Sequence, residues 1–315
     1  MNIEAVQKYL RILSRLNRAS KNGIKAPHKP VMLLSVMQSI ACGEIIENKI
    51  EITPQLVARF KDNWNWLVNE DFFKPNFALP FYHLTSDKFW YLQTYTGKEI
   101  LLTSSLSIRS FSQLREAVAY AFLDEALFTL LQLEESRSAL YLFILEYYFK
   151  TSKPAKVQPG LLEEVTDQIL HEPSVVYQHL IEKADEEEIF IRCGVFKRVV
   201  PQIYNYTCCI SGMHIISGYD IQMVDACHIV PFAVSHNDTI SNGISLSPNL
   251  HRAFDRGLVT VNNDYKVMVS NSFTEHSTDG SIKPYAGKSI VLPVQTTYYP
   301  SLENLQWHRE NIFKN

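Results

Sequence analysis

The strongest constraint on this chain comes from four side chains that can bind a metal ion or move a proton: Asp225, His228, His251 and Asp255. The stretch VDACHIVPF (224–232) predicts a short strand that ends at a proline. The stretch NLHRAFDRG (249–257) predicts a helix that ends near a glycine. In a helix, residues four apart share one face, so His251 and Asp255 can reach the same divalent ion.

These residue types suit the hydrolysis of a phosphodiester. A metal ion neutralises the phosphate charge and stabilises the leaving oxygen, while an imidazole takes a proton from water. Histidine fits the second task because its ordinary pKa of about 6.5 leaves it largely neutral at cell pH. We therefore expect His228 to be the general base and His251 and Asp255 to be metal ligands. Asp225 is a third ligand or an anchor for one of the others.

Three segments in order resemble the HNH endonuclease family with its two-strand, one-helix (ββα) metal finger. They are CISG (209–212), DACHIVPF (225–232) and NGISLSPNLHRAFDRG (242–257). The resemblance covers roughly residues 200–262, about a fifth of the chain. It implies hydrolysis of DNA to a 5′-phosphate and a 3′-hydroxyl.

The resemblance also implies a role for each matching residue. His228 takes the place of the general base, Asn242 that of the asparagine that fixes the connecting loop, and His251 and Asp255 those of metal ligands. The chain departs from the family at Cys227, where many members carry an acid or histidine that binds the metal. A His/Asp site accepts several divalent ions; we expect Mg or Mn, with Ni and Zn as alternatives.

The rest of the sequence predicts an α+β protein with a mostly helical N-terminal domain, a small sheet within it, and a linker before the ββα domain. Helical patterns cover residues 3–17, 30–41, 53–68, 111–133, 136–149, 161–203 and the tail from 301. Two short strands are expected within 79–92, and TSKPAKVQPG (151–160) is the best linker. The predicted domains are 1–150, a helical connector 151–189, and 190–315. The acidic run 182–188 is expected to be a solvated helix face.

Two N-terminal motifs ahead of the ββα segment resemble the sulfur-binding domain of modification-dependent (McrA-like) restriction endonucleases. They are APHKPVMLL (26–34) and ALPFYHLTSDKFWYL (78–92). The resemblance implies that the domain reads phosphorothioate DNA, in which a larger, less hydrated sulfur replaces a phosphate oxygen. By position, it implies four DNA-binding residues: His28, Lys29, Pro80 and His83. Leu79 replaces the family's tyrosine, and His83 stands where a small residue would line the pocket.

Composition sets the remaining expectations. The net charge of −3 excludes a polycation, so DNA binding has to rest on local sites. The five cysteines show no CxxC pair, which argues against a zinc ribbon. The N-terminus reads as an amphipathic helix and no apolar run could span a bilayer, so we expect a soluble cytoplasmic protein. The expected partner is double-stranded DNA, with a homodimer for cutting both strands.

Three other functions stay open at this point. The chain could be a DNA-binding protein whose HNH finger is inactive, or a defence effector nuclease whose first domain senses another ligand. A hydrolase with Cys227 as nucleophile beside His228 is a weaker alternative. Neighbours in a strand point to opposite faces, so that thiol would be badly placed for activation by this imidazole.

Overall fold

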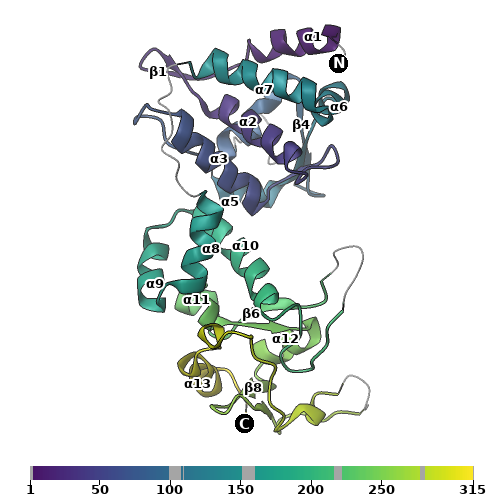
Figure 1. Ribbon diagram of the computed structural model, residues 1–315, viewed down its shortest axis with the longest axis vertical. Coiled ribbons are helices and arrows are strands. Elements are labelled where there is room, and N and C mark those ends of the chain that lie inside the picture. Colours follow the sequence, from purple (N-terminus) through teal and green to yellow (C-terminus); the bar gives the residue numbers. More distant parts are fainter. Residues whose placement is uncertain are drawn as a thin grey trace. The chain divides into compact units, whose positions relative to one another are not determined.

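The computed structural model describes residues 3–98, 108, 110–150, 160–215, 222–276 and 281–314 (Figure 1). The contacts divide the chain into two compact units. The N-terminal unit holds residues 1–162 and 186–191, and the C-terminal unit holds 163–185 and 192–315. Most of the predicted linker, residues 151–159, lies outside the described residues. The boundaries near residues 150 and 190 stay a prediction.

The N-terminal unit is mostly helical, as the sequence predicts. Its helices are α1 (Ile3–Leu13), α2 (His28–Ala41), α3 (Pro54–Leu67), α4 (Ala78–His83), α5 (Phe111–Ala117), α6 (Glu125–Gln132) and α7 (Glu134–Tyr148). Helix α2 is buried along almost its whole length and packs on α3, α4, α6 and α7, so it forms the centre of the unit. Helix α3 begins where the sequence predicts, because the Thr53 hydroxyl accepts a hydrogen bond from Leu56 N at 3.2 Å.

A three-stranded antiparallel sheet completes this unit. Its order is β3 (Ile50–Glu51), β5 (Val118–Leu123) and β4 (Trp90–Thr94), and a small hairpin joins β1 (Ser20–Lys21) to β2 (Ile24–Lys25). The predicted helix over 111–133 is therefore wrong in its middle. Residues 118–123 form the central strand because they pair on both sides, a contact between distant segments that local patterning does not reveal.

The two strands predicted within 79–92 are also corrected. Only the second exists, as β4, and the first is replaced by helix α4 followed by a 3₁₀ turn, η1 (Leu84–Asp87). The Asn76 side chain accepts a hydrogen bond from Leu79 N at 3.0 Å and satisfies the first turn of α4. Pro80 sits in that first turn, where a missing N–H costs little. The aromatic residues that suggested a strand lie instead on a short helix, which buries Phe81.

Most of the acidic run 182–188 is exposed, as expected of a solvated face, but Glu187 departs from the prediction. Helix α10 (Glu186–Ile203) begins there, and its Glu187 is only 6% exposed. Glu187 Oε1 accepts a hydrogen bond from Phe77 N at 2.8 Å, and Lys61 Nζ lies 3.8 Å from Glu187 and 3.4 Å from Glu188. The buried ammonium and carboxylate thus neutralise each other, which is the condition under which such charges are tolerated inside a protein.

The C-terminal unit contains the predicted ββα segment between further helices and two-stranded ribbons. Its elements are α8 (Leu161–His171), α9 (Ser174–Lys183), the remainder of α10, β6 (Asp225–His228), α11 (Phe232–Ser235), η3 (Ile240–Asn242), β7 (Gly243–Leu246), α12 (Pro248–Asp255), β8 (Val259–Val261), β9 (Val267–Val269), η4 (Lys283–Tyr285), η5 (Thr296–Tyr298) and α13 (Leu302–Asn311). Strands β6 and β7 pair antiparallel, with His228 opposite Gly243. A Cβ on Gly243 would lie 2.7 Å from Val200 and 3.0 Å from the Phe196 ring, so glycine lets β7 approach α10 closely.

Helix α12 ends at a glycine that also holds the end of the chain. Gly257 has φ +72° and its N–H bonds to Phe254 O at 2.9 Å, while its own carbonyl accepts from Lys314 N at 2.9 Å. A Cβ on Gly257 would lie 2.0 Å from the carbonyl oxygen of Ile312. The segment after α13 is thereby fixed against the end of the helix that carries His251 and Asp255.

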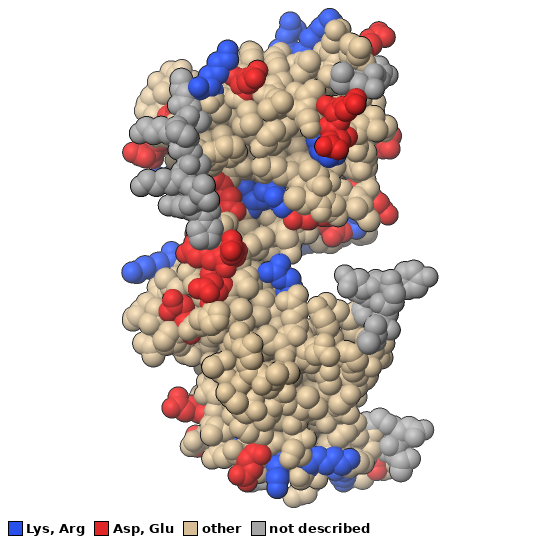
Figure 2. Space-filling view, in the orientation of Figure 1, with Lys and Arg blue, Asp and Glu red and all other residues tan. Residues whose placement is uncertain are grey.

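The surface shows no single basic face on the side in view. Figure 2 shows Lys and Arg side chains interspersed with Asp and Glu, in keeping with the net charge of −3. All five cysteines are free, which agrees with the absence of a CxxC pair. Among the described residues, no helix combines the length and the apolar character that crossing a membrane requires.

Candidate functional site

The two faces of strand β6 point to different surroundings. Neighbouring residues of a strand alternate in direction, so Asp225 and Cys227 share one face and His228 lies on the other. The contacts agree with this rule. Asp225 and Cys227 contact side chains of α12. The His228 ring stacks on Phe196 of α10, with 4.0 Å between the ring centroids and an angle of 7° between the ring planes. This stacking holds the plane of the imidazole.

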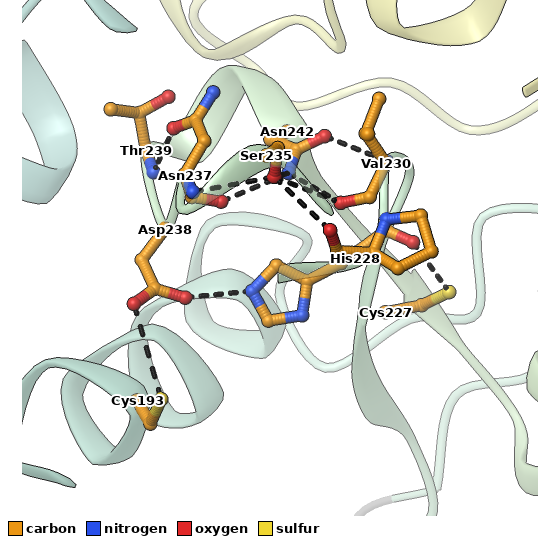
Figure 3. A network of polar contacts seen from close by, with 10 residues as sticks. Cys193, Cys227, His228, Val230, Ser235, Asn237, Asp238, Thr239 and Asn242 are labelled. Atoms are coloured by element: carbon orange, nitrogen blue, oxygen red, sulfur yellow. Dashed lines mark hydrogen bonds and ion pairs between the residues drawn. The ribbon is translucent and has the colours of Figure 1, made fainter. Parts of the chain in front are cut away.

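The His228 ring is also held by a carboxylate that the sequence analysis missed. His228 Nε2 donates to Asp238 Oδ1 at 2.7 Å, and the Asp238 side chain is fully buried (Figure 3). The Cys193 thiol of α10 approaches the other carboxylate oxygen at 4.0 Å. Because the bonded nitrogen carries the proton, the second ring nitrogen, Nδ1, is left to accept one. A His–Asp pair of this kind fixes both tautomer and orientation of a general base.

Asn242 fixes the connecting loop, as its position in the motif implies. It is fully buried, and its Oδ1 accepts from Val230 N at 2.9 Å. Its Nδ2 donates to Val230 O and Asn237 O, both at 2.9 Å, as Figure 3 shows. The asparagine therefore joins the end of β6 to the loop that carries Asp238. These side-chain hydrogen bonds go to the loop and not to the His228 ring, which fits a positioning role.

The predicted metal ligands gather around His251 on helix α12. His251 Nδ1 lies 3.4 Å from Asp225 Oδ2, and His251 Nε2 lies 3.5 Å from Asp255 Oδ2. A buried Cys227 thiol lies 3.8 Å from Asp255 Oδ1. Burial, followed by the charge of Asp255, raises the pKa of this thiol well above its ordinary value. Cys227, His251 and Asp255 each place one donor atom within 4.8 Å of the other two, and this set of thiol, imidazole and carboxylate fits a divalent cation.

A cavity of about 360 Å³ joins the two halves of the site. Its lining includes His228, His251 and Asp255. Helix α13 and the segment after it close one side through His308 and Ile312. The proposed base and the metal-binding side chains, although they lie on opposite faces of β6, therefore open into one space.

His308 supports this wall in its neutral form, and we expect stability to depend on pH for this reason. Its Nε2 donates to Phe254 O at 3.1 Å and its Nδ1 accepts from the Thr260 hydroxyl at 2.8 Å. Burial lowers the pKa of His308 to about 4. The unfolded chain binds the proton near pH 6.5 and the folded chain does not, so stability is lost as pH falls from 6.5 towards 4, by about 3 kcal/mol at most.

Chemical denaturation of the wild type and His308→Gln between pH 7 and pH 4.5 checks this expectation. Glutamine offers one donor and one acceptor but does not titrate. The wild type should lose more stability than the variant over this range. Parallel pH dependence of the two proteins would contradict the role of His308.

The four residues predicted for DNA recognition in the N-terminal unit line a second cavity, of about 650 Å³: His28, Lys29, Pro80 and His83. Phe73 and Leu79 add apolar surface, and Arg18 and Lys21 add positive charge. Segments around residues 18–29 and 73–86 thus line one cavity, and its role in DNA recognition stays a prediction. The cavity combines apolar walls with cationic groups, which suits a large, poorly hydrated atom on an anion.

Lys29 does not offer a free charge to this cavity. Its Nζ donates to Asp87 Oδ2 at 2.6 Å and to the Ser86 hydroxyl at 2.9 Å, and both side chains of the ion pair are less than 9% exposed. Asp87 therefore balances the ammonium in the structure described here. The net positive charge of the cavity comes from Arg18 and Lys21.

Both histidines of this cavity favour the neutral form. Burial lowers the pKa of His28, whose Nε2 donates to Lys74 O at 2.9 Å and whose ring lies 4.5 Å from that of Trp64. Burial, followed by the charge of Lys29, lowers the pKa of His83. With both imidazoles neutral beside Leu79 and Pro80, this part of the lining of the N-terminal cavity is polarisable and carries little charge.

Comparison with known proteins agrees with both halves of this description. A family model of HNH endonucleases matches residues 208–262. A model of the ScoMcrA-like DNA sulfur-binding domain matches residues 6–166, just over half of the chain. The chain is thus a nuclease with an HNH domain, and it belongs to the family defined by the ScoMcrA-like DNA sulfur-binding domain.

A solved structure titled "Modification dependent TagI restriction endonuclease" is similar over 37% of this chain, with 21% identity and a TM-score of 0.28. The similar region is also 37% of that protein's chain. A search of curated proteins found no match. The α+β class, the HNH domain and the sulfur-binding domain predicted from sequence are confirmed, whereas the roles of single residues stay predictions.

Proposed function

We propose that this protein is a metal-dependent restriction endonuclease that cuts DNA carrying phosphorothioate linkages. One observation carries the proposal: His228, with its ring held by Asp238, opens into the same cavity as His251 and Asp255. HNH nucleases generally use a divalent metal. Bound by His251 and Asp255, that ion would neutralise the phosphate charge.

His228 performs the proton transfer. With Nε2 committed to Asp238, Nδ1 takes the proton of the attacking water, and the buried carboxylate stabilises the imidazolium that results. Asn242 holds the loop so that Asp238 stays in register with β6. Because one HNH site cuts one strand, a double-strand break requires two copies of the chain or two binding events.

Recognition of the modification is assigned to the N-terminal cavity. The negative phosphorothioate meets Arg18 and Lys21 at the rim, while the sulfur atom faces the apolar surface of Phe73, Leu79 and Pro80. Sulfur is larger and less strongly hydrated than oxygen, so its removal from water into such a surface costs less. This difference provides discrimination between modified and ordinary DNA.

Cleavage of two matched plasmids, one phosphorothioate-modified and one unmodified, tests the proposal with Mn, Mg, Co or Zn supplied in separate reactions. We expect the wild type to cut only the modified plasmid. Leu79→Glu places a carboxylate in the cavity and should weaken binding of modified DNA at least about tenfold. Ile46→Glu changes an exposed residue of the same unit outside the cavity lining and serves as the control.

Equal metal-dependent cutting of both plasmids would keep the nuclease and contradict the sulfur preference. Absence of cutting on either plasmid would contradict the proposed activity. If Leu79→Glu and Ile46→Glu bound modified DNA equally well, the N-terminal cavity would not be the recognition site.

A further inference from the structure

We propose that Cys227 is a ligand of the nuclease metal, together with His251 and Asp255, and that Asp225 orients His251 without binding the ion. This inference rests on the proposed metal-dependent activity and adds the identity of the third ligand. It also assigns the class of ion: a borderline or soft divalent cation that accepts a thiolate, such as zinc or cobalt, in preference to magnesium.

The positions of the donor atoms support this assignment. One donor atom from each of Cys227, His251 and Asp255 lies within 4.8 Å of the other two. The separations are 3.8 Å between Cys227 Sγ and Asp255 Oδ1 and 3.5 Å between His251 Nε2 and Asp255 Oδ2. With zinc bonds of about 2.3 Å to sulfur and about 2.0 Å to nitrogen or oxygen, neighbouring ligand atoms of a tetrahedron lie roughly 3.5 Å apart. The three side chains therefore bring their donor atoms close to the spacing that one ion requires.

Asp225 occupies a different place relative to the imidazole. Its carboxylate faces His251 Nδ1, whereas Asp255 faces His251 Nε2. These nitrogens lie on opposite edges of the ring, and a histidine binds one ion through one nitrogen. If Nε2 holds the ion beside Asp255, then Nδ1–H donates to Asp225. Carboxylates that accept from the other nitrogen of a ligating histidine fix its tautomer and raise its basicity.

The Cys227 sulfur lies beside another proposed ligand. Its side chain is buried, and the sulfur approaches two oxygens: the backbone carbonyl of His228 at 3.5 Å and Asp255 Oδ1 at 3.8 Å. On binding, the thiol gives its proton to solvent and the sulfur forms a bond to the cation. One thiolate, one carboxylate and a neutral imidazole then balance the charge of a dipositive ion.

The ligand types decide the class of ion. Magnesium demands oxygen ligands in a near-ideal octahedron and keeps several of its waters. Thiolate ligands select zinc and other softer ions, while imidazole suits zinc, copper, iron and nickel. Many HNH nucleases carry an acid at this position. A sulfur in its place favours zinc and other softer ions over magnesium.

Cobalt(II) binding to the full-length protein tests the proposal without reference to cleavage. A cobalt–thiolate bond produces a charge-transfer band in the near ultraviolet, which oxygen and nitrogen ligands do not. We expect the band in the wild type. We expect Cys227→Ser to lose the band and to bind cobalt at least about 100-fold more weakly. Asp225→Asn should keep the band and lose about 10–100-fold in affinity, as expected of a residue that acts through a ligand.

The neighbouring thiol provides the matched control. Cys209 is also fully buried, and Cys209→Ser should keep the band. A wild type that binds cobalt without the band, or that binds none, would overturn the proposal, as would a band that survives in Cys227→Ser. If circular dichroism shows that Cys227→Ser is unfolded, X-ray absorption of the zinc-loaded wild type decides, since one sulfur at about 2.3 Å is expected. Plasmid cleavage with manganese, measured separately, reports on the proposed function itself.

Discussion

His228→Ala is expected to lower the rate of metal-dependent DNA cleavage by about 10²–10⁴-fold, the usual contribution of a general base. The alanine variant removes the only imidazole that combines a buried carboxylate partner with access to the nuclease cavity among the described residues. The ring is held on two sides, by Phe196 and by Asp238, and the other two imidazoles that line the cavity in the described part of the chain, His251 and His308, have no such buried carboxylate partner. DNA binding, measured by gel shift, should remain close to that of the wild type.

Two companion variants make this result specific. His171 lies 2.9 Å from Asp167 on the exposed face of α8 and forms a similar His–Asp pair away from the cavity, so His171→Ala should cut normally. Asp238→Asn keeps a hydrogen-bond acceptor but removes the charge that stabilises the imidazolium, and it should fall between the wild type and His228→Ala. Wild-type cleavage by His228→Ala would remove this residue from the mechanism.

Gly257→Ala is expected to destabilise the protein by about 2–5 kcal/mol. A non-glycine residue at φ +72° costs about 1–2 kcal/mol, and overpacking costs a further 1–3 kcal/mol. The added methyl group would meet the carbonyl oxygen of Ile312, a backbone atom that cannot move aside as a flexible side chain can. The segment after α13 would have to leave the end of α12, and with it one wall of the nuclease cavity.

Gly43→Ala separates the two contributions. Gly43 has φ +73°, almost the same conformation, but nothing lies within 4 Å of the position that its Cβ would take. Its substitution should therefore cost only the conformational part, about 1–2 kcal/mol. Chemical denaturation of the two variants measures the difference. Equal losses would mean that the contact with Ile312 contributes nothing.

The nuclease half of the site could be predicted because its signals are local. A proline that ends a strand, an Asn–Gly pair and a His and Asp four residues apart each fix a short piece of backbone, and their order brings His251 and Asp255 to one face of α12. The N-terminal cavity followed from two quoted motifs whose residues indeed line a single space.

Other features depend on contacts between distant segments, and the sequence alone does not show these. Residues 118–123 form a strand only because two partners flank them. Asp238 lies in a loop without any periodic pattern, ten residues after His228, the proposed base. The only sequence signal for it was an acidic residue in a loop that also contains asparagines. The sequence predicted that Glu187 would be solvated, but it is buried and pairs with the buried Lys61.

The alternation of strand β6 has a consequence for how such enzymes can diversify. Position 227 faces helix α12 and position 228 faces α10, so two neighbouring residues contact two different parts of the protein. If Cys227 binds the ion as proposed, a substitution there would change which ions the protein accepts while the packing around the imidazole stays intact. Inserting or deleting one residue in the strand would instead exchange the two surfaces at once. Under the proposed mechanism, a point mutation at position 227 would therefore alter the choice of ion without disturbing the contacts that hold His228.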